Sequence, residues 1–319
     1  MKVSVIIPVY NADRFIQKSI ESILNQTHRN IEVIICNDCS TDLTKDILGK
    51  ISDFRVTTYE NKQNKGYQRT INFLFTKATG DVIAFQDADD ISHPKRFEQQ
   101  LAILDQENLD LIGTNFCIIN EKDEIIQAKV PVLSDPKHIK DNLIHSNLFQ
   151  KPSILFKTSI LDKIGGYRLE LLKFGIISED YDWLLRICEA GFRMGNVNYK
   201  EPLYKYRSVS TAMTKGFNNA NQFLGHEIVR FLAKERSSLG IDSLTSNNIE
   251  RLTSYIKELK TPFTQDPSFF HRKKAENLMY SGLYSAAIAN AWKGVKKRPS
   301  NFQNWRTLQY CIRKTLFKI

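Results

Sequence analysis

The chain has 319 residues, a mass of 36.9 kDa and a formal net charge of +10. Its length is about twice that of a typical domain. Its composition, with 42% hydrophobic and 25% charged residues, excludes a disordered or fibrous chain. No apolar run approaches the roughly 18 residues of a membrane span, and Pro8 interrupts the first one, so we expect a cytoplasmic protein without a leader. The five scattered cysteines favour reduced thiols.

The net charge comes entirely from the last third of the chain. Residues 1–215 hold 28 Lys and Arg against 28 Asp and Glu, whereas residues 216–319 hold 17 against 7. A basic segment favours an anionic partner such as nucleic acid, lipid headgroups or a phosphorylated substrate. The alternative is a solvated helical face.

Short β-branched runs alternate with helical patterns in the first 90 residues. The runs predict four buried strands, at residues 3–7, 31–35, 55–59 and 82–85. Apolar residues at helical spacing predict three helices, at residues 16–24, 43–51 and 67–77. Ser40 or Thr41 is the expected N-cap of the second helix. The alternation predicts a doubly wound α/β unit with right-handed crossovers.

Acidic side chains follow two of these strands. Asp38 comes after the second strand, and Asp87, Asp89 and Asp90 come after the fourth. In an open α/β sheet, ligands bind at this carboxyl edge. Because carboxylates repel phosphate, their presence there predicts a divalent cation between them and a pyrophosphate.

Several common enzyme motifs are missing from the sequence. It contains no G-x-G-x-x-G, no G-x-x-x-x-G-K-[ST] and no G-x-S-x-G, which argues against a dinucleotide oxidoreductase, a P-loop enzyme and an α/β-hydrolase. His226-Glu227 begins like a zinc protease helix, but Arg230 stands at the place of the second histidine.

Six motifs occur in a characteristic order: VSVIIPVYN at 3–11, NDCSTD at 37–42, TGDVIAFQDADD at 79–90, GGY at 165–167, SEDYDWLLR at 178–186 and LYKYR at 203–207. Together they resemble the family 2 glycosyltransferases of the GT-A fold, over about residues 2–210. The resemblance implies an α/β domain at 1–215, with a mixed, mostly parallel sheet and helices on both faces. A basic C-terminal helical region at 216–319 would follow it.

The resemblance implies an inverting transferase that uses a nucleotide-sugar donor, commonly a UDP-sugar. It implies that Asp38 accepts a hydrogen bond from the uracil imide and that Pro8, Val9 and Tyr10 wall the base. Arg69 matches a family position near the nucleotide, and its alternative is a surface charge on a helix. Asn37 and Cys39, on either side of Asp38, depart from the common pattern of the family at this turn.

Asp87-Ala88-Asp89 matches the D-x-D element of the family. We expect the alternation of a strand end to point both carboxylates the same way, across from Ala88. By resemblance, Asp87 contacts the ribose, and Asp89 with Asp87 binds Mn²⁺ or Mg²⁺ between the donor phosphates. An oxygen-only ligand set favours these ions over zinc. The alternative is a polar turn with Asp90 as a helix cap.

Inversion also needs a base for the acceptor hydroxyl. Asp180 aligns with the catalytic aspartate of the family at the start of an amphipathic helix, and Glu179 is the second choice. Asp182 is a further possibility if an Asp180→Asn variant retains turnover. Lys151 stands where a histidine is frequent, and we expect it to face the acceptor or the diphosphate.

The last third is predicted to be helical. Residues 275–305 resemble a single tetratricopeptide hairpin, which must pack on the preceding helices or on another subunit. Basic residues are interleaved with an apolar stripe in the terminal helix. The stripe consists of Phe302, Trp305, Leu308, Ile312 and Leu316. Such a helix suits the inner face of the plasma membrane, where a polyprenyl-linked acceptor would lie. The alternative is a cap that covers the catalytic domain.

The sequence as a whole predicts a glycosyltransferase that acts on a saccharide or lipid-linked saccharide in surface polysaccharide or lipopolysaccharide synthesis. A catalytically silent nucleotide-sugar-binding or assembly module is the alternative. A nucleic-acid partner is not expected, because the basic third lacks zinc-finger, RNP and basic-zipper patterns. An oligomer remains open.

Overall fold

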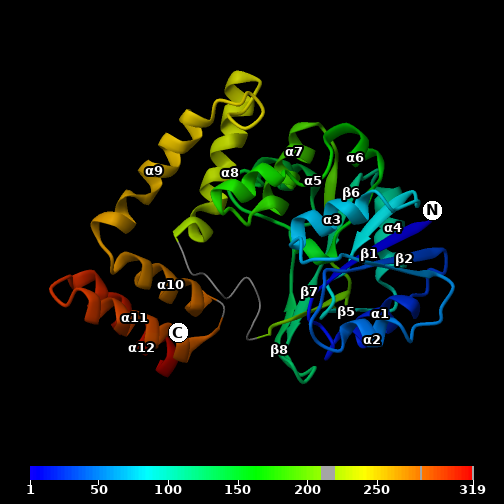
Figure 1. Cartoon of the computed structure of the whole chain (residues 1–319), viewed down its shortest axis with the longest axis horizontal. Helices are drawn as coiled ribbons and strands as arrows, with labels where there is room; N and C mark the ends of the chain where they lie inside the picture. Colours follow the sequence, from blue (N-terminus) through cyan, green and yellow to red (C-terminus); the bar gives the residue numbers. More distant parts are fainter. Residues whose placement is uncertain (210–219, 281, 318–319) are drawn as a thin grey trace. The chain divides into compact units, whose positions relative to one another are not determined.

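The structure is a computed structural model that describes residues 1–209, 220–280 and 282–317. The chain forms two compact units (Figure 1). Unit 1 comprises Met1–Leu169 and Glu179–Val209, and unit 2 comprises Glu170–Ser178 and the chain after Val209. The boundary predicted at residue 215 lies outside the described residues. The short segment 170–178 joins the helical unit, which the sequence did not indicate.

The main sheet of unit 1 has seven strands: β1 (Val3–Val9), β2 (Ile31–Asn37), β3 (Val56–Glu60), β4 (Val82–Phe85), β6 (Leu111–Thr114), β9 (Leu155–Lys157) and β10 (Met194–Val197). Their spatial order is β10-β6-β9-β4-β1-β2-β3. Strand β9 runs antiparallel to both of its neighbours, and the other neighbouring pairs are parallel. The predicted mixed, mostly parallel sheet is therefore confirmed.

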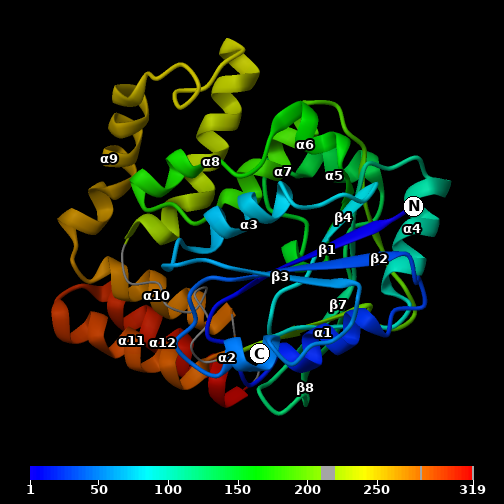
Figure 2. The same cartoon turned by 45° about the vertical axis from the view of Figure 1, so that its right-hand side comes forward.

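Helices cover both faces of this sheet. One face carries α1 (Ile16–Leu24), α2 (Thr44–Leu48) and α4 (Arg96–Gln106), which share one hydrophobic core with alternate residues of β1. The other face carries α3 (Tyr67–Phe75), α6 (Ser159–Ile164) and α7 (Glu179–Glu189). There the sheet meets the helices through five contacting rings: Phe75, Phe85, Phe156, Tyr167 and Trp183. Figure 2 shows α1 and α3 on opposite sides of the strands.

Helix α2 is shorter than the helix predicted over residues 43–51. The predicted cap is wrong as well, because Ser40 Oγ donates to Asn37 Oδ1 at 2.6 Å instead of capping the helix. Thr44 N donates to Asp42 Oδ1 at 3.0 Å, so an aspartate supplies the first acceptor. The short helix leaves the turn after β2 free to carry site residues.

A second, four-stranded sheet was not predicted. It comprises β5 (Ile91–Ser92), β7 (Phe116–Ile119), β8 (Ile125–Val130) and β11 (Tyr204–Arg207), in the order β5-β11-β7-β8. Strand β5 directly follows the turn at 87–90, so this sheet supports the acidic motif. Unit 1 also contains α5 (Pro136–Asn142) and η1 (Lys151–Ser153), and η2 (Leu169–Phe174) begins at its boundary.

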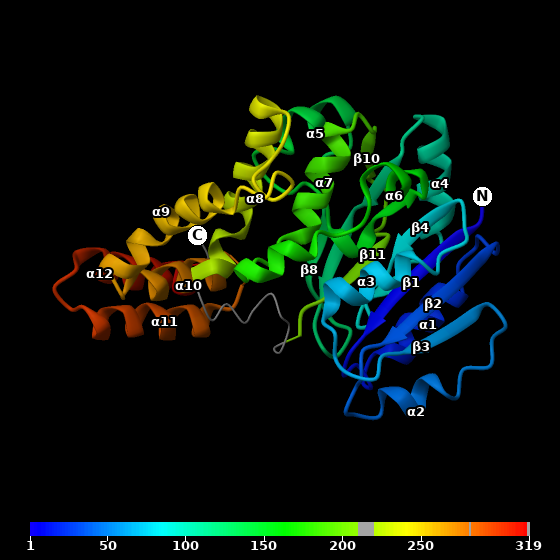
Figure 3. The same cartoon turned by 45° about the horizontal axis from the view of Figure 1, so that its top comes forward.

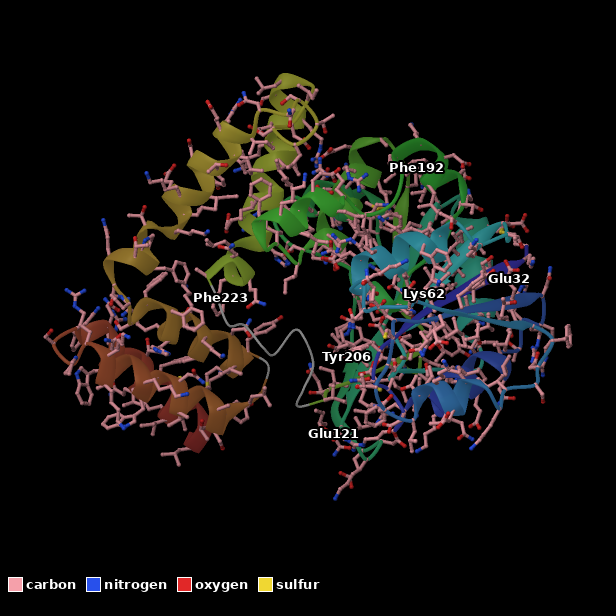
Figure 4. The ribbon with its side chains drawn as sticks, viewed as in Figure 1. Glu32, Lys62, Glu121, Phe192, Tyr206 and Phe223 are labelled. Atoms are coloured by element: carbon pink, nitrogen blue, oxygen red, sulfur yellow. The ribbon has the colours of Figure 1, made fainter. Side chains whose placement is uncertain are left out.

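One charged cluster fastens the amino ends of β1 and β2. Glu32, labelled in Figure 4, accepts hydrogen bonds from Lys2 Nζ at 2.7 Å, from Thr79 N at 2.8 Å and from Ser4 Oγ. Burial opposes ionisation of this carboxyl, but the hydrogen bonds from Lys2, Ser4 and Thr79 outweigh it and lower the pKa of Glu32 to about 2. The cluster therefore stabilises the edge of the sheet opposite the acidic motif.

Unit 2 contains five helices among the described residues: α8 (Ala220–Leu239), α9 (Ile249–Gln265), α10 (Phe269–Tyr280), α11 (Tyr284–Lys297) and α12 (Phe302–Phe317). Helices α8 and α9 share a core with Leu171 and Ile176 of the short segment. Helices α10, α11 and α12 share a second core and lie side by side (Figure 3). The predicted hairpin thus packs on the helix that follows it. No helix among the described residues has the length and apolarity to span a bilayer.

Candidate active site

The D-x-D motif lies in a turn after strand β4. The strand ends at Phe85, Ala88 and Asp89 form the turn, and Asp90 N donates to the carbonyl of Asp87 at 3.3 Å. Strand alternation therefore does not place the two carboxyl groups, which corrects the prediction. Asp87 and Asp89 are partly exposed, whereas Asp90 is fully buried.

Three buried side chains hold this turn, and the sequence predicted a role for none of them. Gln86 Nε2 donates to the carbonyl of Asp90 at 2.9 Å, and Gln86 Oε1 accepts from Arg96 Nη1 at 3.2 Å. Arg207 N donates to Asp90 Oδ1, and Arg207 Nε donates to the carbonyl of Asp89, both at 2.6 Å. Buried groups that satisfy one another in this way fix one backbone geometry. Their sequence signal is weak, because each resembles an ordinary polar residue beside a strand or helix.

Lys151 forms an ion pair with the first aspartate of the motif. Its Nζ lies 3.0 Å from Asp87 Oδ1 and 3.3 Å from Oδ2, donates to the Tyr67 hydroxyl, and lies 4.2 Å from the centre of the Tyr67 ring. Burial alone would lower the pKa of Lys151, but the charges of Asp87, Tyr167 and Asp180 and the hydrogen bond to Asp87 together outweigh burial and raise the pKa above its usual value. Lys151 is therefore a fixed positive charge beside the first aspartate.

Asp89 differs from Asp87 in its surroundings. Burial, followed by the negative charge of Asp87, raises the pKa of Asp89 to about 6. Two neighbouring carboxylates in a partly desolvated site repel each other. A hard divalent cation bound by their oxygen atoms would relieve that repulsion. The pair therefore fits such an ion. Among the described residues, no group of three or more His, Cys, Asp or Glu side chains could hold a metal.

Asp38 orders the loop that leads into α3. Its Oδ1 accepts from Asn61 Nδ2 at 2.7 Å and from Lys65 N at 2.9 Å, and its Oδ2 accepts from Gly66 N at 2.8 Å. Gly66 has a φ of 85°, a conformation that favours glycine. Since a carboxylate oxygen accepts two hydrogen bonds, Oδ2 retains one acceptor position.

The other residues expected around the base are only partly accessible. Tyr10 is 50% exposed and Pro8 is partly buried. The Val9 side chain is buried in the core beneath β1, so it cannot wall a base, which corrects that expectation. Arg69 is exposed on α3, where its Nη1 donates to the carbonyl of Lys65 at 3.2 Å.

The three acids at the start of α7 have different surroundings. Asp182 is fully buried and paired with Arg168 and Arg186, whose Nε atoms each lie 3.0 Å from Asp182 Oδ2. Both guanidinium groups are themselves mostly buried. Asp182 therefore belongs to the architecture of α7 and is not available as a base.

Glu179 and Asp180 also differ from each other. Glu179 is buried and accepts from Gln68 Nε2 at 2.7 Å, and burial followed by the charge of Asp180 raises the pKa of Glu179 to about 7. Asp180 is partly exposed and accepts from Asn147 Nδ2 at 3.2 Å. The more accessible acid on this turn is therefore Asp180.

Tyr67 lies close to the site residues that the sequence predicted. Burial raises its pKa well above the usual value, and the charges of Asp87, Glu179 and Asp180 raise it further. Lys151, which donates to the Tyr67 hydroxyl, is influenced by both Asp87 and Asp180. The structure thus gathers the D-x-D motif, the acids of α7 and Lys151 at one place. The sequence predicted roles for the D-x-D acids, for Asp180 and Glu179 and for Lys151, but none for Tyr67.

Comparison with known proteins identifies the family of the chain. Residues 4–167 match the family model "Glycosyl transferase family 2". The chain is similar to the Escherichia coli enzyme named UDP-Glc:α-D-GlcNAc-diphosphoundecaprenol β-1,3-glucosyltransferase WfaP. The two are 34% identical over 214 residues, which cover 67% of this chain and 80% of WfaP.

Two solved structures share the fold. S. aureus TarS 1-349 in complex with UDP-GlcNAc superposes with a TM-score of 0.57 at 17% identity, covering 99% of this chain and 92% of TarS 1-349. The mannosyltransferase PcManGT from Pyrobaculum calidifontis, solved with GDP-Man and Mn²⁺, gives a TM-score of 0.52 at 17% identity and covers 100% of this chain and 88% of that one. This chain therefore belongs to glycosyl transferase family 2 and is a glycosyltransferase with the GT-A fold.

Proposed function

We propose that this chain transfers a sugar, with inversion of the anomeric carbon, from a nucleoside diphosphate sugar to a hydroxyl of a saccharide or polyprenyl-linked saccharide. The observation that carries the proposal is the meeting of Asp87, Lys151 and Asp180 around Tyr67, beyond the carboxyl end of β4. The name of WfaP and the ligand of TarS favour a UDP-sugar donor and a surface polysaccharide or lipopolysaccharide product.

Asp87 and Asp89 would hold the divalent ion, Mn²⁺ or Mg²⁺. Their oxygen-only donor set suits hard cations, and the structure of PcManGT contains Mn²⁺. When bound, such an ion stabilises the negative charge of a departing nucleoside diphosphate. Lys151 holds the Asp87 carboxylate in place and balances part of the acidic charge of the site.

Asp180 is the proposed base. An acceptor hydroxyl must lose its proton as it attacks, so the base has to lie within reach of the acceptor. Asp182 is committed to two arginines and Glu179 is buried, whereas Asp180 is partly exposed. Glu179 remains the second choice, since it lies beside Asp180 and holds Gln68.

Asp38 is the proposed contact for the base of the nucleotide. Its Oδ2 has an acceptor position left after Gly66 N is bound, which suits the N–H group of uracil. Tyr10 directly follows β1 and is exposed, and Arg69 is exposed on α3. These positions support a uridine donor.

Nucleotide binding and turnover test the proposal together. We expect UDP to raise the thermal midpoint of the wild type only with Mn²⁺, and Asp89→Ala to lose that shift. A ligand at about 100 times its Kd stabilises by about 2.7 kcal/mol, or a few degrees. GDP and dTDP are the matched controls. If no nucleotide shifts the midpoint under any condition, a silent binding or assembly module becomes the better description.

Asp180→Asn separates chemistry from binding. We expect it to lower transfer, measured as UDP release in the presence of an acceptor, by about 10² to 10⁴. The UDP shift with Mn²⁺ should persist, because Asp180 does not hold the nucleotide. Glu179→Gln is the matched control on the same turn. Retained turnover in Asp180→Asn together with its loss in Glu179→Gln would move the base to Glu179.

A further inference from the structure

Helix α12 exposes most of its apolar stripe. Phe302 and Leu316 are 71% and 69% exposed, and Trp305 and Ile312 are also exposed. Of the five stripe residues predicted for this helix, only Leu308 is buried. The stripe is therefore mostly not the packing face of the helix.

A different face of α12 packs on its neighbours. Asn304, Leu308 and Cys311 are buried against α10 and α11. Asn304 Oδ1 accepts from Arg272 Nη1 at 2.6 Å, and Asn304 Nδ2 donates to the carbonyl of Arg298 at 2.9 Å. These buried hydrogen bonds fix the rotation of α12 about its axis, because turning the stripe inward would leave the Asn304 amide and its partners unsatisfied.

The exposed apolar surface continues onto α11. The rings of Trp292 and Trp305 meet edge to face, with centres 6.1 Å apart, and both side chains are more than two-fifths exposed. Trp305 Nε1 donates to the carbonyl of Pro299 at 2.8 Å, which holds the indole in place. We call the resulting surface the aromatic face and define it by its members: Trp292, Phe302, Trp305, Ile312 and Leu316.

Positive charge surrounds the aromatic face. From Tyr284 to Phe317 the sequence has seven Lys and Arg and no Asp or Glu. Lys296 Nζ lies 6.0 Å from the centre of the Trp292 ring, and Arg306 and Arg313 are exposed on α12. On a helix, positions 302, 306 and 313 lie within about 40° of one another, so both arginines flank the stripe.

The chemistry of this surface selects its partner. Aromatic rings beside cations suit either stacked bases or a membrane interface, but exposed Ile312 and Leu316 gain only from hydrocarbon. A second copy of the chain would bring like charges together. We propose that the aromatic face docks on an anionic lipid surface, with its apolar side chains among the acyl chains and its cations at the headgroups.

Vesicle flotation of the full chain tests the proposal, independently of sugar transfer. We expect binding to phosphatidylcholine vesicles that contain phosphatidylglycerol and little binding to phosphatidylcholine alone. Arg306→Gln with Arg313→Gln should weaken binding about twentyfold to thirtyfold, because each charge near the surface contributes about fivefold. Added salt should weaken wild-type binding in the same direction.

The apolar side chains are tested by Phe302→Ser with Leu316→Ser, which should weaken vesicle binding at least about tenfold. Phe54→Ser in unit 1 is the matched control, since Phe54 is 95% exposed and outside the aromatic face. Lys50→Gln with Lys122→Gln is the control for charge. Circular dichroism and thermal midpoints close to wild type show that the variants fold.

Several outcomes would overturn the proposal. Equal loss of vesicle binding in the control variants would mean that unspecific charge or hydrophobicity is responsible. Absence of wild-type binding to anionic vesicles would exclude the lipid surface outright. Binding of duplex DNA that the Phe302→Ser, Leu316→Ser variant abolishes, or a dimer that it dissociates, with vesicle binding unchanged, would assign the face to those partners.

Discussion

The two units treat charge in opposite ways. In unit 1 the acids of the site have partners inside the fold, as Asp182 has in Arg168 and Arg186 and Asp87 has in Lys151. In unit 2 the helices α11 and α12 carry six cations and no acid of their own, on an exposed surface. The difference shows how each surface meets its partner. Paired, buried charges fix the geometry that catalysis needs, whereas unbalanced exposed charges suit a partner without fixed geometry.

The same difference sets the energetic cost of substitutions. Removing one member of a buried ion pair leaves the other uncompensated, which is among the costliest single changes in a protein. Substitutions on an exposed surface usually change stability by less than about 0.5 kcal/mol. Substitutions in unit 1 are therefore best followed by stability measurements, and substitutions on the exposed surface of unit 2 by binding measurements.

The largest expected effect on stability is that of Asp182→Asn. The substitution removes the negative charge that pairs with two mostly buried arginines, so we expect a loss of about 3 to 5 kcal/mol in the free energy of unfolding. Chemical denaturation of the full chain measures it. Asp46→Asn on α2, at an exposed position, is the matched control. An unchanged unfolding curve would show that the pairing in unit 1 is not what stabilises α7.

Lys151→Met is expected to have an intermediate effect, on ion binding. Removing a cation 3.0 Å from Asp87 should tighten Mn²⁺ binding at the D-x-D motif by at least about tenfold, because two unit charges about 4 Å apart interact by about 4 kcal/mol at an effective dielectric of 20. Isothermal titration with Mn²⁺ measures this without any turnover. Lys157→Met, which removes a similar pair with Asp110, is the control. Equal Mn²⁺ affinity in both variants would contradict the role given to Lys151.

The smallest effect is expected for Glu32→Gln, about 1 to 3 kcal/mol at neutral pH. The folded pKa of Glu32, about 2, lies below its ordinary 4.5, so the stabilisation is complete above pH 4.5 and is lost as the pH falls through about 2. Thermal midpoints of the two proteins should therefore differ at pH 7 and converge toward pH 2. A difference that is independent of pH would mean that packing, and not the charge, is what Glu32 contributes.

The sequence predicted those parts of the fold that depend on near neighbours. The β-branched runs at 3–7, 31–35 and 82–85 became buried central strands, because a strand covered on both faces needs apolar residues at nearly every position. The acids after β2 and β4 were found for the same reason, since the carboxyl ends of parallel strands lie at one edge.

Tertiary structure decided what depends on distant residues. Strand β9 enters the sheet antiparallel between β4 and β6, and Arg207 reaches the D-x-D turn from more than a hundred residues away. No local periodicity records such pairings. The sequence also did not show which of the acids Glu179, Asp180 and Asp182 is accessible. Three acids within four positions differ only in the residues that surround them in the fold.

Helix α12 shows most clearly what the sequence alone cannot determine. By itself the sequence determined that the helix is amphipathic and basic, since helical spacing and side-chain charge are local properties. It did not determine which side packs. The rotation of the helix was decided by Asn304, whose buried hydrogen bonds to Arg272 and to the carbonyl of Arg298 require partners from elsewhere in the fold. A buried polar group must be satisfied, whereas an apolar stripe tolerates exposure, and this asymmetry is a property of the assembled structure.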